Sequence, residues 1–128
     1  RLERWRRIAT EAAKQSQRAG VPEIAPVSHI EGLPGVLGGA RIFVCWEDAV
    51  DAPGIDAAIT DAALDPAAPV AVVVGPEGGF TAEEVRELER LGAATVSLGP
   101  TVLRTGTAGV VAAALAIHAR GGLGGCRG

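Results

Sequence analysis

The sequence PVAVVVGPEGGFTAEE, residues 69–84, marks the clearest change of structure along the chain. Its apolar run, Val70–Val74, is mostly β-branched and stops at a glycine–proline pair. Such a run is typical of a buried strand in a parallel sheet. Thr81 and Glu84 have the spacing of a capping box, in which each side chain bonds the backbone N–H of the other, so a helix is predicted over residues 81–91. The stretch therefore predicts a strand, a glycine-containing loop and a helix.

The loop between this strand and this helix is a candidate ligand site. Glycines let a ligand approach the backbone closely, and α/β sheets bind small molecules at the carboxyl ends of their strands. A P-loop would need a lysine, but the only lysine in the chain is Lys14, and the dinucleotide fingerprint Gly-x-Gly-x-x-Gly is absent. Glu77 is also a poor neighbour for a phosphate. The loop by itself indicates either a ligand other than a polyphosphate or a tight turn that binds nothing.

The rest of the chain repeats the alternation of strands and helices. Further strands are predicted over residues 40–46 and 94–98, and further helices over residues 2–19, near 55–64, and from the end of a 99–106 loop to residue 119. Residues 21–39 are rich in proline and glycine and predict loops. This order predicts an α/β layer fold with a parallel sheet in one domain, residues 1–120, followed by a flexible tail, residues 121–128.

Composition excludes several classes of protein. Hydrophobic residues make up 48% of the chain, which is enough for a core, and no apolar run approaches the roughly 20 residues of a membrane span. The two cysteines, Cys45 and Cys126, and the two histidines form no metal or redox motif. We expect a reduced, cytoplasmic protein without a metal and without a membrane partner.

Charge is distributed unevenly along the chain. Residues 1–18 carry six basic and two acidic side chains, whereas the remaining residues carry six basic and thirteen acidic ones. At 100° per residue, four of the basic residues lie within a narrow arc of the first helix that also contains Glu11. Such an arc indicates contacts with an anionic partner, or ordinary solvated helix charges. The four basic residues are Arg4, Arg7, Lys14 and Arg18.

A second strand-to-helix loop follows the third predicted strand. It lies within LGPTVLRTGTAG, residues 98–109, and again has a Gly-Pro pair just past the strand. Two such loops on neighbouring parallel strands would lie together and form a cleft for one ligand. Arg104 is the only charged residue in this region and would either contact that ligand or cap the last helix.

These segments carry a family resemblance. GPEGGFT at residues 75–81, LGP-x-x-LRT-x-TA at residues 98–108, and RW-x-x-I-x-x-EAA-x-QS-x-R at residues 4–18 followed by VPEI stand in the same order as motifs of a known family. The chain resembles the 16S ribosomal RNA uridine-N3 methyltransferases, which belong to the trefoil-knotted SPOUT-type methyltransferases and use S-adenosylmethionine. The three motifs span most of the chain.

The resemblance implies an architecture and partners that composition does not show. The C-terminal part would be threaded through an earlier loop as a deep trefoil knot. The protein would be a homodimer with its active site near the subunit interface, and it would act on 16S ribosomal RNA or the small ribosomal subunit. A full-length member also has an N-terminal RNA-binding domain of the PUA type, and we expect that domain to be absent from this chain.

The resemblance also implies site residues. Arg18 and Arg104 would stabilise negative charge on the target base or grip a phosphate, and Glu11 and Glu77 are candidate general bases. The two loops would hold S-adenosylmethionine, with the apolar walls for adenine supplied by leucines. The cofactor-binding residues would be Val74, Gly75, Glu77, Gly78, Gly79, Leu98, Gly99, Pro100 and Leu103.

Two departures from the family pattern leave an alternative function open. Thr101 stands where an arginine is common, and Gly106 stands where a glutamate is expected. If that glutamate positions substrate or base, the chain would be a non-catalytic RNA-binding or ribosome-assembly module with the same fold. A small nucleotide-binding protein of another kind is a third possibility, and the missing dinucleotide fingerprint counts against it.

Overall fold

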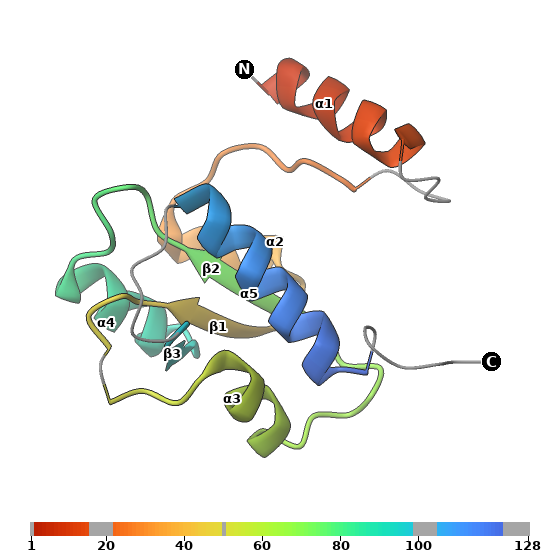
Figure 1. Cartoon of the computed structure of the whole chain (residues 1–128). Helices are drawn as coiled ribbons and strands as arrows, with labels where there is room; N and C mark the ends of the chain where they lie inside the picture. Colours follow the sequence, from red (N-terminus) through yellow and green to blue (C-terminus); the bar gives the residue numbers. More distant parts are fainter. Residues whose placement is uncertain (1, 16–21, 50, 99–104, 122–128) are drawn as a thin grey trace.

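The computed structural model describes residues 2–15, 22–49, 51–98 and 105–121. Helices and strands alternate through most of the chain (Figure 1). Their bounds, in order, are α1 Leu2–Gln15, the 3-10 helix η1 Ile30–Gly32, α2 Leu33–Val36, β1 Arg41–Cys45, α3 Ile55–Asp61, β2 Val70–Val74, α4 Ala82–Arg90, β3 Ala94–Val96 and α5 Thr105–Ala119.

The three strands form one parallel sheet in the order β2-β1-β3. Phe43 of β1 is opposite Val72 of β2 and Ala94 of β3. A parallel sheet was predicted and is confirmed, but the expectation that β2 and β3 are neighbours is wrong, because β1 lies between them. Residues 42–45 of β1 are all buried, whereas every residue of β2 is half-buried. The most completely buried strand thus takes the centre, where both of its edges are paired.

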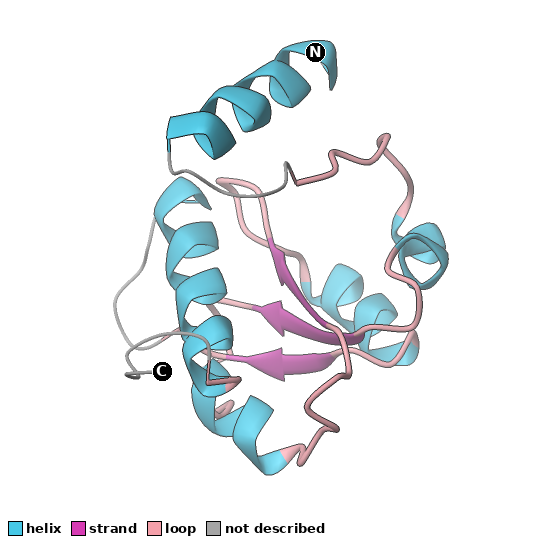
Figure 2. Cartoon of the chain, turned by 90° about the vertical axis from the view of Figure 1, so that its right-hand side faces the viewer, coloured by secondary structure: helices cyan, strands magenta, loops and turns pink. Residues whose placement is uncertain are grey.

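Helices cover both faces of the sheet (Figure 2). Along β1 the side chains alternate, as the pleat of a strand requires. Phe43 and Cys45 pack on the face covered by α3 and α5, together with Val96, Ile55 and Ala112. On the opposite face, Ile42 and Val44 pack with Val85 and Leu88 of α4 and, beyond them, with side chains of η1 and α2. The result is a three-layer α/β domain whose core is built from small aliphatic residues around a single buried phenylalanine.

A local sequence signal accounts for the start of α4 and for the presence of α3, but not for every helix boundary. The capping box of α4 is complete, because the Thr81 hydroxyl accepts the Glu84 N–H at 3.1 Å and the Glu84 carboxylate accepts the Thr81 N–H at 2.9 Å. The predicted helix near residues 55–64 is α3. Helix α5 begins at Thr105, two residues earlier in the chain than the predicted loop allowed. The short helices η1 and α2 were not predicted, because residues 30–36 contain two glycines and a proline.

Side chains of two arginines join segments that are distant in sequence. Arg41 Nη1 donates to the carbonyl oxygen of Gly92 at 3.0 Å, which ties the start of β1 to the turn before β3. Arg120 Nη2 lies 3.1, 2.9 and 2.5 Å from the carbonyl oxygens of Asp65, Pro66 and Ala68. Arg120 therefore fastens the end of α5 to the segment that leads into β2.

Helix α1 lies to one side of the layered body (Figure 1). The predicted apolar face of this helix is only partly covered: Ala13 is buried, but Trp5 and Ile8 are 41% and 55% exposed. Arg6 donates to the carbonyl oxygen of Ile24 at 3.2 Å and so links α1 to the segment that follows it. Within the described ranges, no helix has the length and apolar character needed to cross a membrane.

Candidate functional site

The glycine loop after β2 forms a tight turn at the carboxyl edge of the sheet. Gly79 N–H donates to the carbonyl oxygen of Pro76 at 2.8 Å, which places Glu77 and Gly78 at the tip of the turn. Gly79 has φ of +75°, a conformation that glycine adopts at little cost and other residues rarely adopt. The loop therefore has a fixed backbone that leads directly into the capped start of α4.

The three glycines of this loop have different surroundings. A Cβ on Gly75 would lie 3.1 Å from the ring of Phe80, so this glycine accommodates the phenylalanine. A Cβ on Gly79 would collide with the carboxylate of Glu47. A Cβ on Gly78 would have no heavy atom of the described chain within 4 Å. Only at Gly78 is there open space, so a ligand that approaches the loop backbone would do so there.

The end of β1 borders this loop. Trp46 Nε1 donates to the carbonyl oxygen of Phe80 at 3.1 Å, and both rings pack over the α4 face of the sheet. Glu47 follows Trp46 and lies against Gly79. Neither residue was among the predicted site residues, because the prediction placed β2 beside β3. The sequence does contain a signal for these two site residues, because a Trp-Glu pair directly follows a buried strand.

The structure describes only the beginning of the second predicted loop. Leu98 is half-buried and packs against the core on the α5 face, as Val74 also does. Ser97 N–H donates to the carbonyl oxygen of Pro53 at 2.9 Å, so the end of β3 lies beside the start of α3. Gly99, Pro100, Leu103 and Arg104, with Thr101, fall outside the described residues.

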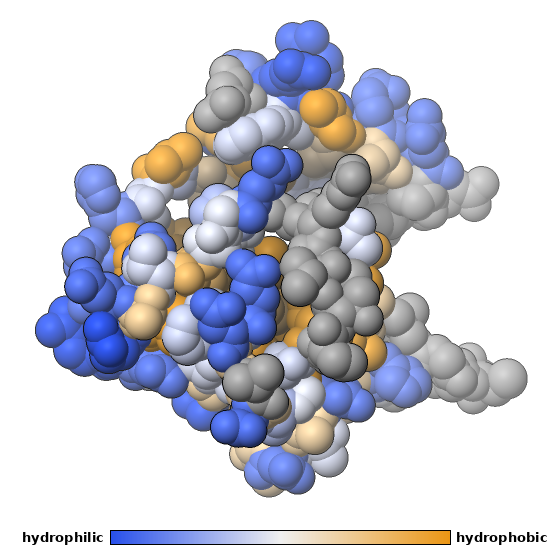
Figure 3. All heavy atoms as spheres, turned by 60° about the vertical axis from the view of Figure 1, so that its left-hand side comes forward, coloured by the Kyte–Doolittle hydropathy of each residue, from blue (hydrophilic) through white to orange (hydrophobic). Residues whose placement is uncertain are grey.

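The basic arc of α1 is exposed. Arg4, Arg7 and Lys14 have exposed side chains, and Lys14 Nζ lies 4.0 Å from a carboxylate oxygen of Glu11. Strongly hydrophilic side chains gather at the end of the molecule where α1 lies (Figure 3). No hydrogen bond or ion pair between described residues joins α1 to the glycine loop. Arg18 lies outside the described residues.

Cys45 and the acidic side chains provide neither a nucleophile nor a metal site. Burial raises the pKa of the Cys45 thiol from 9.0 to about 11, which keeps it protonated at neutral pH. No group of histidine, cysteine, aspartate and glutamate in the described ranges is arranged to hold a metal ion.

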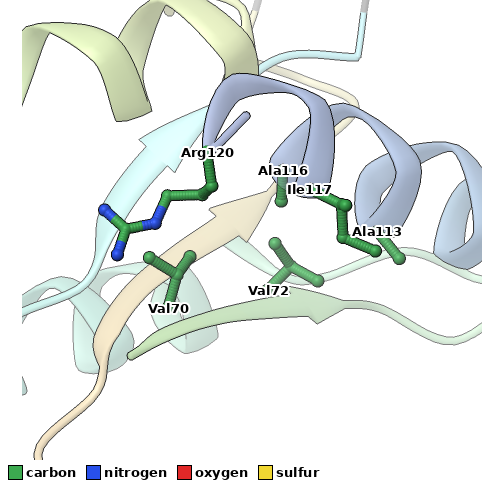
Figure 4. Close-up of a pocket in the computed structure, with 6 residues that line it drawn as sticks. All are labelled: Val70, Val72, Ala113, Ala116, Ile117 and Arg120. Carbon is green, nitrogen blue, oxygen red and sulfur yellow. The ribbon is translucent and has the colours of Figure 1, made fainter. Parts of the chain in front are cut away.

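A pocket of about 360 Å³ lies between β2 and α5 (Figure 4). It is apolar except for Arg120 at one end, and Val70, the first residue of β2, contributes to its wall. The glycine loop follows the last residue of β2, so this pocket lies toward the opposite end of the strand. It is therefore separate from the predicted cofactor site. Its lining residues are Val70, Val72, Ala113, Ala116, Ile117 and Arg120.

Comparisons with known proteins agree with this arrangement. Residues 1–117 match the RNA methyltransferase domain family. Ribosomal RNA small subunit methyltransferase E of Mycobacterium bovis is 40% identical over 119 residues, which cover 87% of this chain and 42% of the relative. The chain thus spans less than half the length of that relative.

Two solved structures share the fold. Ribosomal RNA small subunit methyltransferase E from Neisseria gonorrhoeae, bound to S-adenosyl methionine, is 30% identical with a TM-score of 0.71, over 90% of this chain and 45% of that chain. A Legionella pneumophila methyltransferase in complex with the cofactor SAM is 29% identical with a TM-score of 0.67, over 92% and 46%. On the match of residues 1–117, this chain belongs to the RNA methyltransferase domain family.

Proposed function

We propose that the chain binds S-adenosylmethionine at the carboxyl edge of its sheet and is part of an enzyme that methylates N3 of a uridine in 16S ribosomal RNA. The observation that carries the proposal is the loop at residues 75–79, with its rigid turn and the open space at Gly78. Family membership and two solved relatives that hold this cofactor support it. Residues 98–103 would complete the site from the third strand.

The chemistry places a limited demand on the protein. S-adenosylmethionine supplies an activated methyl group, because its sulfonium leaves as a neutral thioether. Uracil N3 carries a proton and is a poor nucleophile until that proton is removed. The chain must therefore orient the two reactants, accept the N3 proton and stabilise the anionic base.

Four residues are the candidates for these roles. Glu77, exposed at the tip of the loop turn, and Glu11 on α1 are candidate bases. Arg18 and Arg104 are the candidate cations that would stabilise the anion or hold a phosphate. Arg4, Arg7 and Lys14 would hold the RNA by its phosphates, which gives affinity without sequence information. Glu77 belongs to the proposed cofactor loop itself, which favours it over Glu11 as the base.

Dimerisation and a trefoil knot complete the proposal. The buried face of α5 consists of Ala108, Ala112 and Ala116, whereas Val110 and Ile117 on another side are 71% and 47% exposed. An apolar strip of this kind on a helix indicates a surface that another molecule covers. We assign this strip to contacts with a second copy of the chain, which makes the protein a homodimer. We further propose that the protein is cytoplasmic and that residues 1–120 form one knotted domain.

Isothermal titration calorimetry with S-adenosylmethionine, NAD and ATP tests the central proposal. The protein should bind S-adenosylmethionine and show no heat with the other two. Gly78→Val should weaken this binding at least about tenfold, because a branched side chain would occupy the space that a ligand needs at the loop. Its free energy of unfolding should change little, since a Cβ at this position meets no described atom.

The matched control is Gly35→Val in α2, where a Cβ also has no described atom within 4 Å. This variant should retain cofactor affinity. Gly79→Val is a poorer test, because φ of +75° and the nearby Glu47 carboxylate would strain the fold. A folded Gly78→Val protein with undiminished affinity would place the cofactor elsewhere.

A further inference from the structure

Glu47 is an acidic residue whose carboxylate lies against the backbone of the glycine loop. It follows β1, the central strand, so it lies between the carboxyl ends of β2 and β3. The hydrogen bond from Trp46 to the Phe80 carbonyl oxygen fixes the preceding residue against the loop. The Glu47 carboxylate then occupies the space that a side chain on Gly79 would fill.

The Glu47 carboxylate has its acceptor oxygens available to a ligand. No hydrogen bond or ion pair joins it to any other residue in the described part of the chain, and the side chain is exposed. One of its oxygens lies against Gly79, which can accept that contact because it has no Cβ. A negative charge is thereby placed beside the loop without a cation from the described residues to neutralise it.

We propose that Glu47 determines charge specificity at the cofactor site, by favouring the positively charged methyl donor over the neutral thioether that remains after transfer. This inference rests on the proposed binding of S-adenosylmethionine at residues 75–79. A carboxylate attracts the sulfonium cation but gains nothing comparable from an uncharged sulfur. Glu47 would thus help the site to bind the donor and to release the product, and it would do so as a specificity-determining residue that receives no proton in the reaction.

The competing role for a carboxylate here is to accept a hydrogen bond from a ribose hydroxyl. The donor and the product have the same ribose, so that role would affect both affinities equally. A comparison of ligands that differ only near the sulfur therefore separates the two roles. S-adenosylmethionine carries a sulfonium, S-adenosylhomocysteine a neutral thioether, and sinefungin an ammonium group at the corresponding position.

Calorimetry of the full chain and its Glu47→Gln variant with these three ligands tests the inference. Glutamine has nearly the shape of glutamate, so the contact with Gly79 is kept and only the charge is lost. We expect S-adenosylmethionine and sinefungin to bind about tenfold more weakly to the variant, and S-adenosylhomocysteine to change by less than about twofold. The control is Asp61→Asn at the end of α3, an exposed aspartate beyond the opposite end of the sheet, which should leave all three affinities unchanged.

Equal losses for all three ligands would overturn the inference in favour of a hydroxyl contact, and unchanged affinities would overturn it outright. In both cases the unmodified protein would still bind S-adenosylmethionine, so the proposed function would stand. If the unmodified protein binds none of the three ligands, the proposed function fails first. Each of these conclusions requires that the Glu47→Gln variant unfold in the same transition as the unmodified protein.

Discussion

Trp46 and Phe80 are 34 residues apart in sequence, yet the indole N–H of one donates to the carbonyl oxygen of the other at 3.1 Å. This bond joins the end of the central strand to the end of the glycine loop. Trp46→Phe keeps an aromatic ring in the same layer but removes the donor. We expect it to lower the free energy of unfolding by about 1 kcal/mol, the usual net contribution of such a bond. Urea unfolding measures that loss.

The same substitution should weaken S-adenosylmethionine binding, because the loop and Glu47 would lose a common anchor. Calorimetry measures that effect, and Gly35→Val again serves as the variant with unchanged affinity. A Trp46→Phe protein with full stability and full affinity would show that this bond does not position the loop or Glu47.

The buried thiol of Cys45 predicts a loss of stability at high pH. Its pKa is raised to about 11 in the folded protein and is 9.0 when the side chain is free in solvent. The folded state therefore favours the protonated thiol, and the stabilising effect is complete below pH 9 and declines as the pH rises from 9 toward 11. Urea unfolding of the unmodified protein and of Cys45→Ala across this range should show a steeper decline for the unmodified protein. Parallel declines would exclude Cys45 as the cause.

The basic arc of α1 predicts salt-dependent RNA binding. The double variant Arg7→Glu, Lys14→Glu should bind a 16S ribosomal RNA fragment more weakly and reduce the slope of log affinity against log salt by about 1.5, because two phosphate contacts are lost. Affinity for S-adenosylmethionine should not change, since α1 has no described bond to the loop. The matched control is Arg86→Glu, Arg90→Glu on α4, where both side chains are exposed. If both double variants weaken RNA binding alike, the arc has no special role.

The exposed strip of α5 predicts a dimer that charge would separate. Val110 and Ile117 are seven residues apart, about two turns, and so lie on one side of the helix. The double variant Val110→Glu, Ile117→Glu should sediment as a monomer at micromolar concentration, whereas the unmodified protein should sediment as a dimer. Val27→Glu, Val36→Glu exchanges two other exposed valines, which are 87% and 50% exposed, and should remain a dimer. Sedimentation of the unmodified protein only as a monomer would refute the homodimer.

Local signals predicted the elements well where they were strong. The bounds of β2 match the predicted strand, because a mostly β-branched run ends in a glycine–proline pair. The start of α4 also matches, since its capping box needs only residues 81–84. Ala63, by contrast, adopts φ of +48° just after α3. The sequence contains no signal for this conformation, because the residue is neither glycine nor asparagine.

Spatial order was the part that the sequence could not supply. The position of β1 between β2 and β3 depends on which strand buries both faces most completely, and that is a property of the whole core. The error had a consequence for the site, because Trp46 and Glu47 reach the loop only from a central β1. Gly75, Gly78 and Gly79 look alike in the sequence, but one accommodates Phe80, one faces open space and one accommodates Glu47.

The position of β1 also constrains the order in which the chain can fold as it is synthesised. The central strand is made first of the three, but its partners are complete only at residues 74 and 96. The face of β1 that carries Phe43 is closed by α5, whose end is fastened by Arg120 to residues 65–68. During translation the most deeply buried strand is therefore made before the elements that cover it, and contacts so distant in sequence form slowly. A chain that stops short of Arg120 would leave its apolar core open to association with other chains.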